Sequence, residues 1–248
     1  MRLLENESKR LFQDNKIPVP EGAVISSPED LTLDGKTVVK AQVPTGGRGK
    51  AGGVLFCEDL SQAREQAGRL LGSSLLGYSV EKVLAEQALD IVEEYFLAAT
   101  YDTANKHPVI IFSTRGGVDI EELAGEHPEL IFRAGFDILD GFGEHRAREL
   151  VNDAGLTGGD LMKISGILHR LVTLFLESDA TVAEINPLVK TRDGRFFAVD
   201  GHMDIEDDAL YRHPELESTY GITKRETVGR EPTGFEIKAA GIDSQDHR

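Results

Sequence analysis

A glycine-rich stretch in the first quarter of the chain carries residues suited to holding an anion. Residues 45–53 read TGGRGKAGG and directly follow the apolar segment 37–43. Glycine leaves the backbone bare, so such a loop can close over phosphate groups while Arg48 and Lys50 supply positive charge. The same pattern is also typical of an ordinary mobile hairpin loop, and these residues alone leave both readings open.

Two familiar nucleotide-binding motifs do not fit this loop. A dinucleotide-binding G-x-G-x-x-G pattern opens a helix whose first amides meet the pyrophosphate. Residues 53–57 read GVLFC, which instead predicts a strand. A P-loop has Ser or Thr after its lysine, whereas Ala51 follows Lys50. Any phosphate site here would therefore be a glycine loop between two strands.

Lys40 lies within the apolar segment that precedes the loop. An ammonium group in an apolar strand needs an anionic partner, and a phosphate would satisfy it. The alternative is an ordinary strand lysine that faces outward into solvent.

A second group of polar residues lies on a predicted hairpin near the end of the chain. Glu184 and Asn186 are two apart and share one face of a strand, and the turn at Asp193-Gly194 brings Asp200 within one register step of Asn186. Such neighbours lie roughly 4.5 to 8 Å apart, so one ion could touch both. Oxygen ligands of this kind suit Mg²⁺. The alternative is a polar, solvent-facing side of the hairpin. His202 is expected to be a surface or hydrogen-bonding residue.

Composition excludes several classes of partner. The chain has 248 residues and a formal net charge of −16, which disfavours general binding to nucleic acid or to anionic membranes. No apolar run approaches the roughly 20 residues needed to cross a bilayer, and the start of the chain lacks a signal-peptide segment. The single Cys57 cannot form an internal disulfide. A reducing, cytoplasmic compartment is expected.

The elements that must position these residues alternate along the chain. Periodicity predicts helices at 6–15, 60–71, 119–124 and 160–177. Strands are predicted at 22–25, 37–43, 54–57, 82–85, 94–101, 108–113, 181–190 and 195–200. In the longest helix, apolar residues recur every three or four positions and predict a core-facing stripe. A mixed α/β organisation follows.

Two long motifs in the right order resemble the β subunits of succinyl-CoA synthetases. Residues 38–43, VVKAQV, continue through GGRGKAGGV at 46–54 and resemble the phosphate-binding segment of that family. EINPLV at 184–189, followed by VDG at 199–201, resembles its metal-binding segment. STRGGVDIE at 113–121 and DDALYR at 207–212 extend the agreement to about residue 220.

The resemblance implies an ATP-grasp fold, in which a small lid lobe and a larger lobe clamp a nucleotide. On that basis residues 1–225 form the ATP-grasp domain, with the lid at about 21–90 and the larger lobe at 1–20 and 91–225. Residues 226–248 are expected to be a connector to a CoA-ligase domain that family members carry and this chain lacks. The chain is then either an N-terminal piece or a natural split subunit.

The resemblance also implies a set of site residues. Those expected at the phosphates are Lys40, Gly47, Arg48 and Gly49. Those expected to border the base and ribose are Glu86, Leu89 and Glu94. Asn186 and Asp200 are expected to hold Mg²⁺, and Glu184 to help steer a phosphorylated histidine.

In the family, phosphoryl passes from ATP or GTP to a histidine of a CoA-binding α subunit, then to a carboxylic acid, and the acyl phosphate is exchanged for a CoA thioester. This chain is thus expected to supply the nucleotide end only. Arg115, with EQA at 86–88, is similar to malate–CoA ligases and leaves the acid open. Two other readings remain: an ATP-grasp ligase with a different acceptor, and a non-catalytic nucleotide-binding or assembly module.

Overall fold

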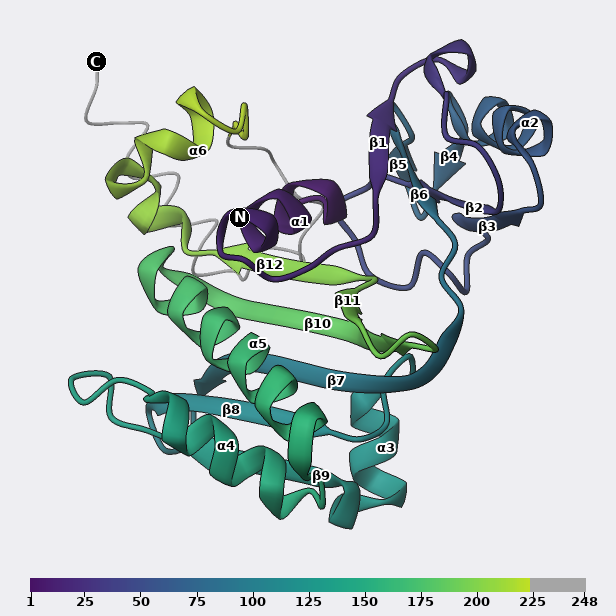
Figure 1. The fold of residues 1–248 in the computed structure, drawn as a ribbon. Coiled ribbons are helices and arrows are strands. Elements are labelled where there is room, and N and C mark those ends of the chain that lie inside the picture. Colours follow the sequence, from purple (N-terminus) through teal and green to yellow (C-terminus); the bar gives the residue numbers. More distant parts are fainter. Residues whose placement is uncertain (224–248) are drawn as a thin grey trace, which may run out of the picture.

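The computed structural model describes residues 1–223 and shows two lobes, each built on its own antiparallel sheet (Figure 1). The smaller lobe has the strand order β1-β6-β2-β3. These strands are β1 (Gly22–Ile25), β6 (Val83–Gln87), β2 (Thr37–Ala41) and β3 (Val54–Cys57). A short hairpin, β4 (Ser74–Leu75) and β5 (Tyr78–Ser79), and a 3-10 turn, η1 (Pro28–Asp30), complete this lobe.

One face of the smaller sheet is covered by α2 (Leu60–Leu70). The helix begins at Asp59, whose side chain accepts a hydrogen bond from the Gln62 backbone N–H. It buries Ala63 and Ala67 against the sheet in a separate small core that includes Val39. Since side chains alternate along a strand, Val38 and Lys40 project from the opposite face, toward the larger lobe.

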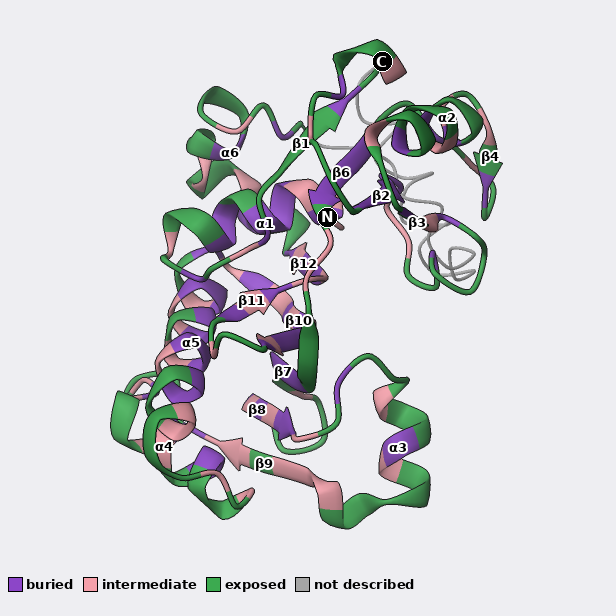
Figure 2. Ribbon diagram, turned by 45° about the vertical axis from the view of Figure 1, so that its right-hand side comes forward, coloured by how far each residue is buried: buried purple, intermediate pink, exposed green. Residues whose placement is uncertain are grey.

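The larger sheet runs β11-β10-β7-β8-β9, and β12 also pairs with β10. These strands are β11 (Phe196–Ala198), β10 (Ala180–Thr191), β7 (Ile91–Asp102), β8 (His107–Ser113), β9 (Ile131–Gly135) and β12 (Gly201–Ile205). The helices α4 (Glu144–Asp153) and α5 (Gly158–Glu177) pack on one face and bury the main core (Figure 2). The remaining elements are α3 (Ile120–Glu126), η2 (Pro128–Leu130), η3 (Asp207–Arg212) and α6 (Pro214–Ser218).

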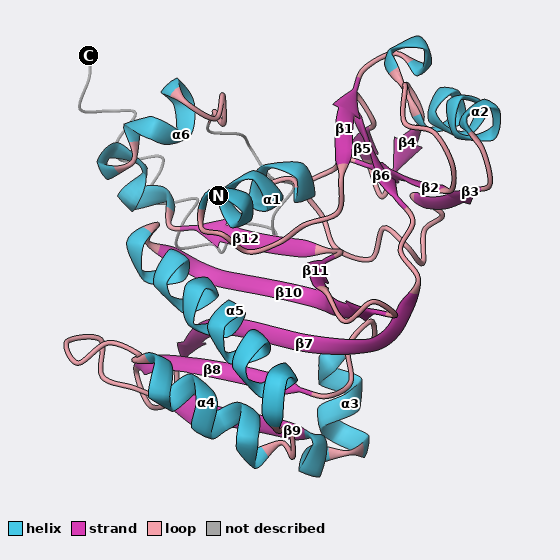
Figure 3. Cartoon of the chain, in the orientation of Figure 1, coloured by secondary structure: helices cyan, strands magenta, loops and turns pink. Residues whose placement is uncertain are grey.

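The first helix, α1 (Glu5–Asp14), belongs to the larger lobe but lies where the two lobes meet (Figure 3). Its Leu11 and Phe12 are buried in the main core, beside β12 and α5. A side chain at Gly201 would come within 2.3 Å of the Phe12 ring, so α1 rests directly on the β12 backbone. The opposite side of α1 is therefore free to face the smaller lobe.

Most predicted elements are confirmed, with ends shifted by a few residues. The stripe predicted on the longest helix is buried as expected: Ile164, Leu168, Leu171 and Phe175 are fully enclosed. Cys57 is buried at the end of β3. No strand was predicted at β9 or β12 and no helix at α4. The predicted connector at 226–248 lies outside the described residues, and within 1–223 no helix has the length and apolarity to span a bilayer.

Candidate nucleotide site between the lobes

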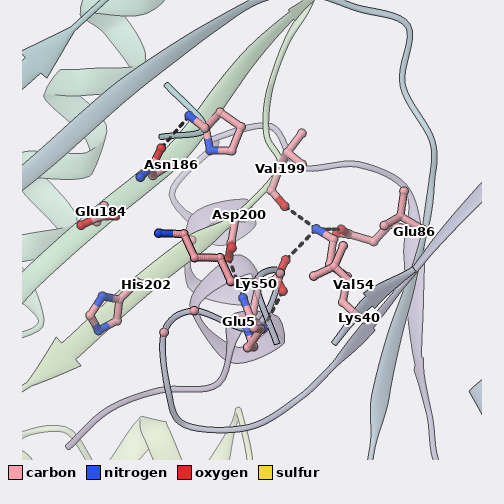
Figure 4. A pocket seen from close by; sticks show the side chains of 18 of the residues that line it. Glu5, Lys40, Lys50, Val54, Glu86, Glu184, Asn186, Val199, Asp200 and His202 are labelled. Carbon is pink, nitrogen blue, oxygen red and sulfur yellow. Dashed lines mark hydrogen bonds and ion pairs between the residues drawn. The ribbon is translucent and has the colours of Figure 1, made fainter. Parts of the chain in front are cut away.

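A cavity of about 620 Å³ lies between the two lobes (Figure 4). Every residue predicted for the site lines it. From the smaller lobe and the strand connection come Lys40, Gly47, Arg48, Gly49, Glu86 and Leu89, and from the larger lobe Glu94, Glu184, Asn186 and Asp200. The fold thus brings the glycine loop and the acidic hairpin, some 140 residues apart in sequence, to opposite walls of one space.

The glycine loop connects two antiparallel strands, as predicted, and no helix begins at it. β2 pairs with β3 in the register Lys40↔Val54, and the Gly53 N–H donates to the Arg48 carbonyl at 2.8 Å. Gly47 has a positive φ of 75°, a conformation that other residues rarely adopt. The turn holds its bare backbone against the cavity while the Arg48 side chain reaches inward and Lys50 stays exposed.

Lys40 is buried and fully neutralised by the protein itself. Its Nζ lies 2.9 Å from Glu5 Oε1 and 2.8 Å from Glu86 Oε2, and donates to the Val199 carbonyl at 2.6 Å. The expectation that this ammonium group needs an anion is confirmed. Two carboxylates of the chain hold this ammonium group in the described structure, and its contact with a phosphate stays a prediction.

Arg48 extends the same network across the cavity. Its Nη1 lies 2.8 Å from Glu5 Oε2, and its Nη2 donates to Asp200 Oδ1 at 2.8 Å. Lys9, on the next turn of α1, bonds Glu86 at 2.6 Å and lies 2.8 Å from Glu5. The pairs of Glu5 and Asp200 with Arg48, of Glu5 with Lys40 and of Lys9 with Glu86 thus connect the two lobes.

The pKa values of this network follow from its burial and its charges. Burial by itself raises the pKa of Glu5, but the charges of Lys40, Lys9 and Arg48 outweigh burial and hold that pKa far below its usual range. For Lys40, burial is outweighed by Glu5 and Glu86, so its pKa is raised. Burial lowers the pKa of Lys9, which shares the same carboxylates.

Asn186 and Asp200 face each other on the hairpin, as predicted. The register Ile185↔Gly201 and the bond from the Asn186 N–H to the Asp200 carbonyl, at 3.1 Å, place them directly opposite. Asn186 is oriented by Gly117, whose N–H donates to its Oδ1 at 2.8 Å. Enclosure in the cavity and the Glu5 charge raise the pKa of Asp200.

The donor set fits Mg²⁺. An amide oxygen and a carboxylate oxygen from opposed strands are hard ligands, and Mg²⁺ commonly takes one or two protein ligands and completes its shell with water and phosphate. Among residues 1–223 no three acidic, histidine or cysteine side chains converge on one point. Within that part of the chain, a divalent ion at this position would therefore take its remaining ligands from water and a bound phosphate.

A second group of charges lies further along the hairpin. Glu184 is opposite His202 in the β10–β12 ladder, and His202 Nε2 lies 3.1 Å from Asp204 Oδ2. Arg2 also pairs with Asp204, at 3.3 Å. Burial raises the pKa of Glu184, partly offset by the nearby His202. His202 thus lies at the cavity wall near Asp204, and within residues 1–223 its Nε2 has no hydrogen-bond partner.

The other end of the cavity is apolar. It is lined by Pro20, Val38, Val54, Phe56, Leu89, Ile91 and Pro187. Glu94 lies beside this group, and burial raises its pKa. The carboxylate of Glu86, expected beside the base, points instead into the ion-pair network. A cavity that is apolar at one end and carries Lys40, Arg48 and hard oxygen ligands at the other suits a ligand with a flat apolar group and a chain of phosphates.

Sequence reasoning missed Glu5, Lys9 and the Val199 carbonyl. Glu5 and Lys9 are four residues apart on a helix, a spacing that is ordinarily that of an exposed ion pair. Nothing local indicates that both are buried against Lys40 and Glu86, because that contact depends on how α1 is placed between the lobes.

A comparison with models of protein families identifies the family of this chain. The family model described as "ATP-grasp domain" matches residues 2–190. The chain therefore belongs to the ATP-grasp family.

Curated proteins of similar sequence identify more specific relatives within this family. The chain is 42% identical over 216 residues to the protein named succinate–CoA ligase [ADP-forming] subunit beta of Methanocaldococcus jannaschii, covering 86% of this chain and 59% of the relative. It is also 42% identical over 221 residues to the [GDP-forming] subunit beta of Thermus thermophilus, covering 87% and 58%. The resemblance to succinate–CoA ligase β subunits is thus confirmed, and the chain spans less than two thirds of these relatives.

Solved structures agree on the fold. ATP citrate lyase from Methanothrix soehngenii matches with a TM-score of 0.70 at 21% identity, covering 98% of this chain and 60% of that one. The dinucleotide forming acetyl-coenzyme A synthetase 1 of Ca. Korarchaeum cryptofilum matches with a TM-score of 0.64 at 17% identity, covering 83% and 93%. The predicted mixed α/β ATP-grasp fold is confirmed.

Proposed function

We propose that this chain is the nucleotide-binding part of the β subunit of an ADP- or GDP-forming acid–CoA ligase of the succinate–CoA ligase type. One observation carries the proposal: Arg48 of the glycine loop and the opposed pair Asn186 and Asp200 line the same cavity between two lobes. That arrangement provides cations for phosphate oxygens and hard ligands for Mg²⁺ in one place. The relatives' names supply the reaction class.

The roles proposed for the site follow from its two ends. Lys40, Arg48 and the amides around Gly47 and Gly49 bind and orient the phosphates, and the apolar end near Leu89 receives the base. Asn186 and Asp200 hold Mg²⁺, which when bound neutralises phosphate charge during transfer. Positioning and electrostatic stabilisation are therefore this chain's main contribution to the reaction.

The acceptor is proposed to come from another subunit. A CoA-binding α subunit would present the histidine that receives the phosphoryl group, and Glu184 would orient that histidine at the far end of the cavity. The carboxylic acid and CoA would be handled by the complete enzyme, in the cytoplasm and within the tricarboxylic acid cycle. Residues 21–90 would act as the lid that closes over the nucleotide.

Radiolabel transfer tests the proposal. The chain is incubated with Mg²⁺, ATP labelled at the γ-phosphate and the α subunit of a homologous ligase, and acid-labile, base-stable label is measured on each polypeptide. Label on the α subunit that is lost with Asp200→Asn supports the proposal. In a parallel incubation with succinate and no α subunit, labelled acyl phosphate would indicate an ATP-grasp ligase with another acceptor. Nucleotide binding without either product would indicate a binding or assembly module.

A further inference from the structure

The cations proposed to bind the phosphates are already neutralised by a carboxylate from α1. Glu5 is fully enclosed, with 0% of its side chain exposed, and each of its oxygens meets a different cation of the smaller lobe. Oε1 lies 2.9 Å from Lys40 Nζ (Figure 4). Oε2 lies 2.8 Å from Arg48 Nη1. An anion therefore bridges the two groups before any nucleotide is bound.

The network around this bridge is balanced in charge. Three cations, Lys9, Lys40 and Arg48, meet three carboxylates, Glu5, Glu86 and Asp200. Adding a nucleotide brings further negative charge to Lys40 and Arg48, and Mg²⁺ would compete with Arg48 for Asp200. Some of the existing ion pairs must then weaken, because a lysine ammonium group has only three N–H donors. All three donors of Lys40 already have an acceptor.

We infer that Glu5 is a positioning residue that holds Lys40 and Arg48 in the nucleotide-free protein. When a nucleotide binds, its phosphates replace Glu5 as the partner of these two cations, and Glu5 thereby lowers the nucleotide affinity. The inference rests on the proposed function. Lys9 makes the exchange feasible, because it lies 2.8 Å from Glu5 and keeps that buried carboxylate paired after the other two cations turn to the ligand.

The direction of the effect follows from linkage. A contact that stabilises the free protein more than the complex makes the free energy of binding less favourable, by the difference between the two stabilisation energies. Replacing Glu5 with a neutral side chain leaves Lys40 and Arg48 undercompensated in the free protein, whereas phosphate oxygens compensate them in the complex. Couplings between sites are typically about 5- to 150-fold in affinity, so Glu5→Gln should tighten binding within that range.

The test compares three ligands by calorimetric titration: Mg-ADP, inorganic tripolyphosphate and adenosine. Glu5→Gln should bind the first two at least about fivefold more tightly than the native chain and leave adenosine unchanged. Leu11→Ala, a change in the apolar side of the same helix, is the matched control and should lower stability without changing affinity for any of the three. Unchanged or weaker Mg-ADP binding by Glu5→Gln would overturn the inference.

A second variant guards against loss of folding. Glu5→Gln combined with Lys9→Met removes one charge of each sign and keeps the network balanced while still freeing Lys40 and Arg48. It should also bind tripolyphosphate more tightly, and native-like affinity in this folded variant would overturn the inference. If the native chain itself fails to bind Mg-ADP, the proposed function fails instead, so the two failures are distinguishable.

Discussion

Removing the charge of Lys40 should destabilise the folded chain more than removing the charge of Lys190, although each lysine has two carboxylate partners. Lys40 is 4% exposed and contacts Glu5, Glu86 and the Val199 carbonyl at 2.6 to 2.9 Å. In Lys40→Met the apolar stem is kept and the ammonium group is lost. Two buried carboxylates then share the remaining cations.

The size of the loss follows from burial. Breaking a buried ion pair by removing one partner costs about 3–5 kcal/mol, because the other charge is left uncompensated. Lys9 still pairs with both carboxylates, at 2.8 and 2.6 Å, and Arg48 still meets Glu5. The lower end of the range, about 3 kcal/mol, is therefore expected for Lys40→Met.

Urea unfolding followed by circular dichroism measures this loss, with Lys190→Met as the matched control. Lys190 also has two carboxylate partners, Asp160 at 2.6 Å and Glu93 at 3.3 Å, but lies near the surface. Its replacement should cost at most about 1 kcal/mol, as exposed ion pairs do. If both variants lost the same small amount, the reasoning that the Lys40 network is desolvated would be refuted.

Three further predictions concern the walls of the site and the core. Burial raises the pKa of Glu184 above its ordinary 4.5, so the ionised carboxylate lowers the stability of the folded chain at neutral pH. Glu184→Gln should therefore raise Tm at pH 7. This gain should vanish below about pH 4.5, where the native carboxyl group is protonated in both the folded and the unfolded chain. Gly201→Ala should cost about 1–3 kcal/mol in urea unfolding, because its new methyl group would lie 2.3 Å from the Phe12 ring. Phe175→Ala should cost about 3–5 kcal/mol, whereas Leu139→Ala, at a side chain 91% exposed, should stay within about 0.5 kcal/mol.

The elements predicted correctly are those whose signal is local. The α5 stripe repeats at helical spacing over 20 residues, and the turn at Asp193-Gly194 fixes the register of the hairpin that places Asn186 opposite Asp200. α4 gave no such signal, since only Ala147, Leu150 and Val151 are buried in it and the rest is polar. Its position is decided by packing against α5, which no local pattern reveals.

The residues of the candidate site likewise fall into those that local sequence could predict and those that it could not. The glycine loop and the acidic hairpin could be predicted because each is a continuous motif. The partners of Lys40 could not, because Glu5 and Glu86 come from a helix and a strand that meet only in the folded chain. A buried lysine indicates that an anion must be present, but its sequence neighbours do not say whether a ligand or the protein supplies it.

The central claim is that the cavity between the lobes binds a Mg-nucleotide through the glycine loop and the opposed pair Asn186 and Asp200. Calorimetric titration of the chain with ADP, ATP and GTP, with and without Mg²⁺, tests it most directly, with Asp200→Asn run alongside. Saturable binding that requires Mg²⁺ and weakens at least about tenfold in the variant is the predicted result. Binding of no nucleotide, or Mg²⁺-dependent binding that Asp200→Asn leaves unchanged, would contradict the claim.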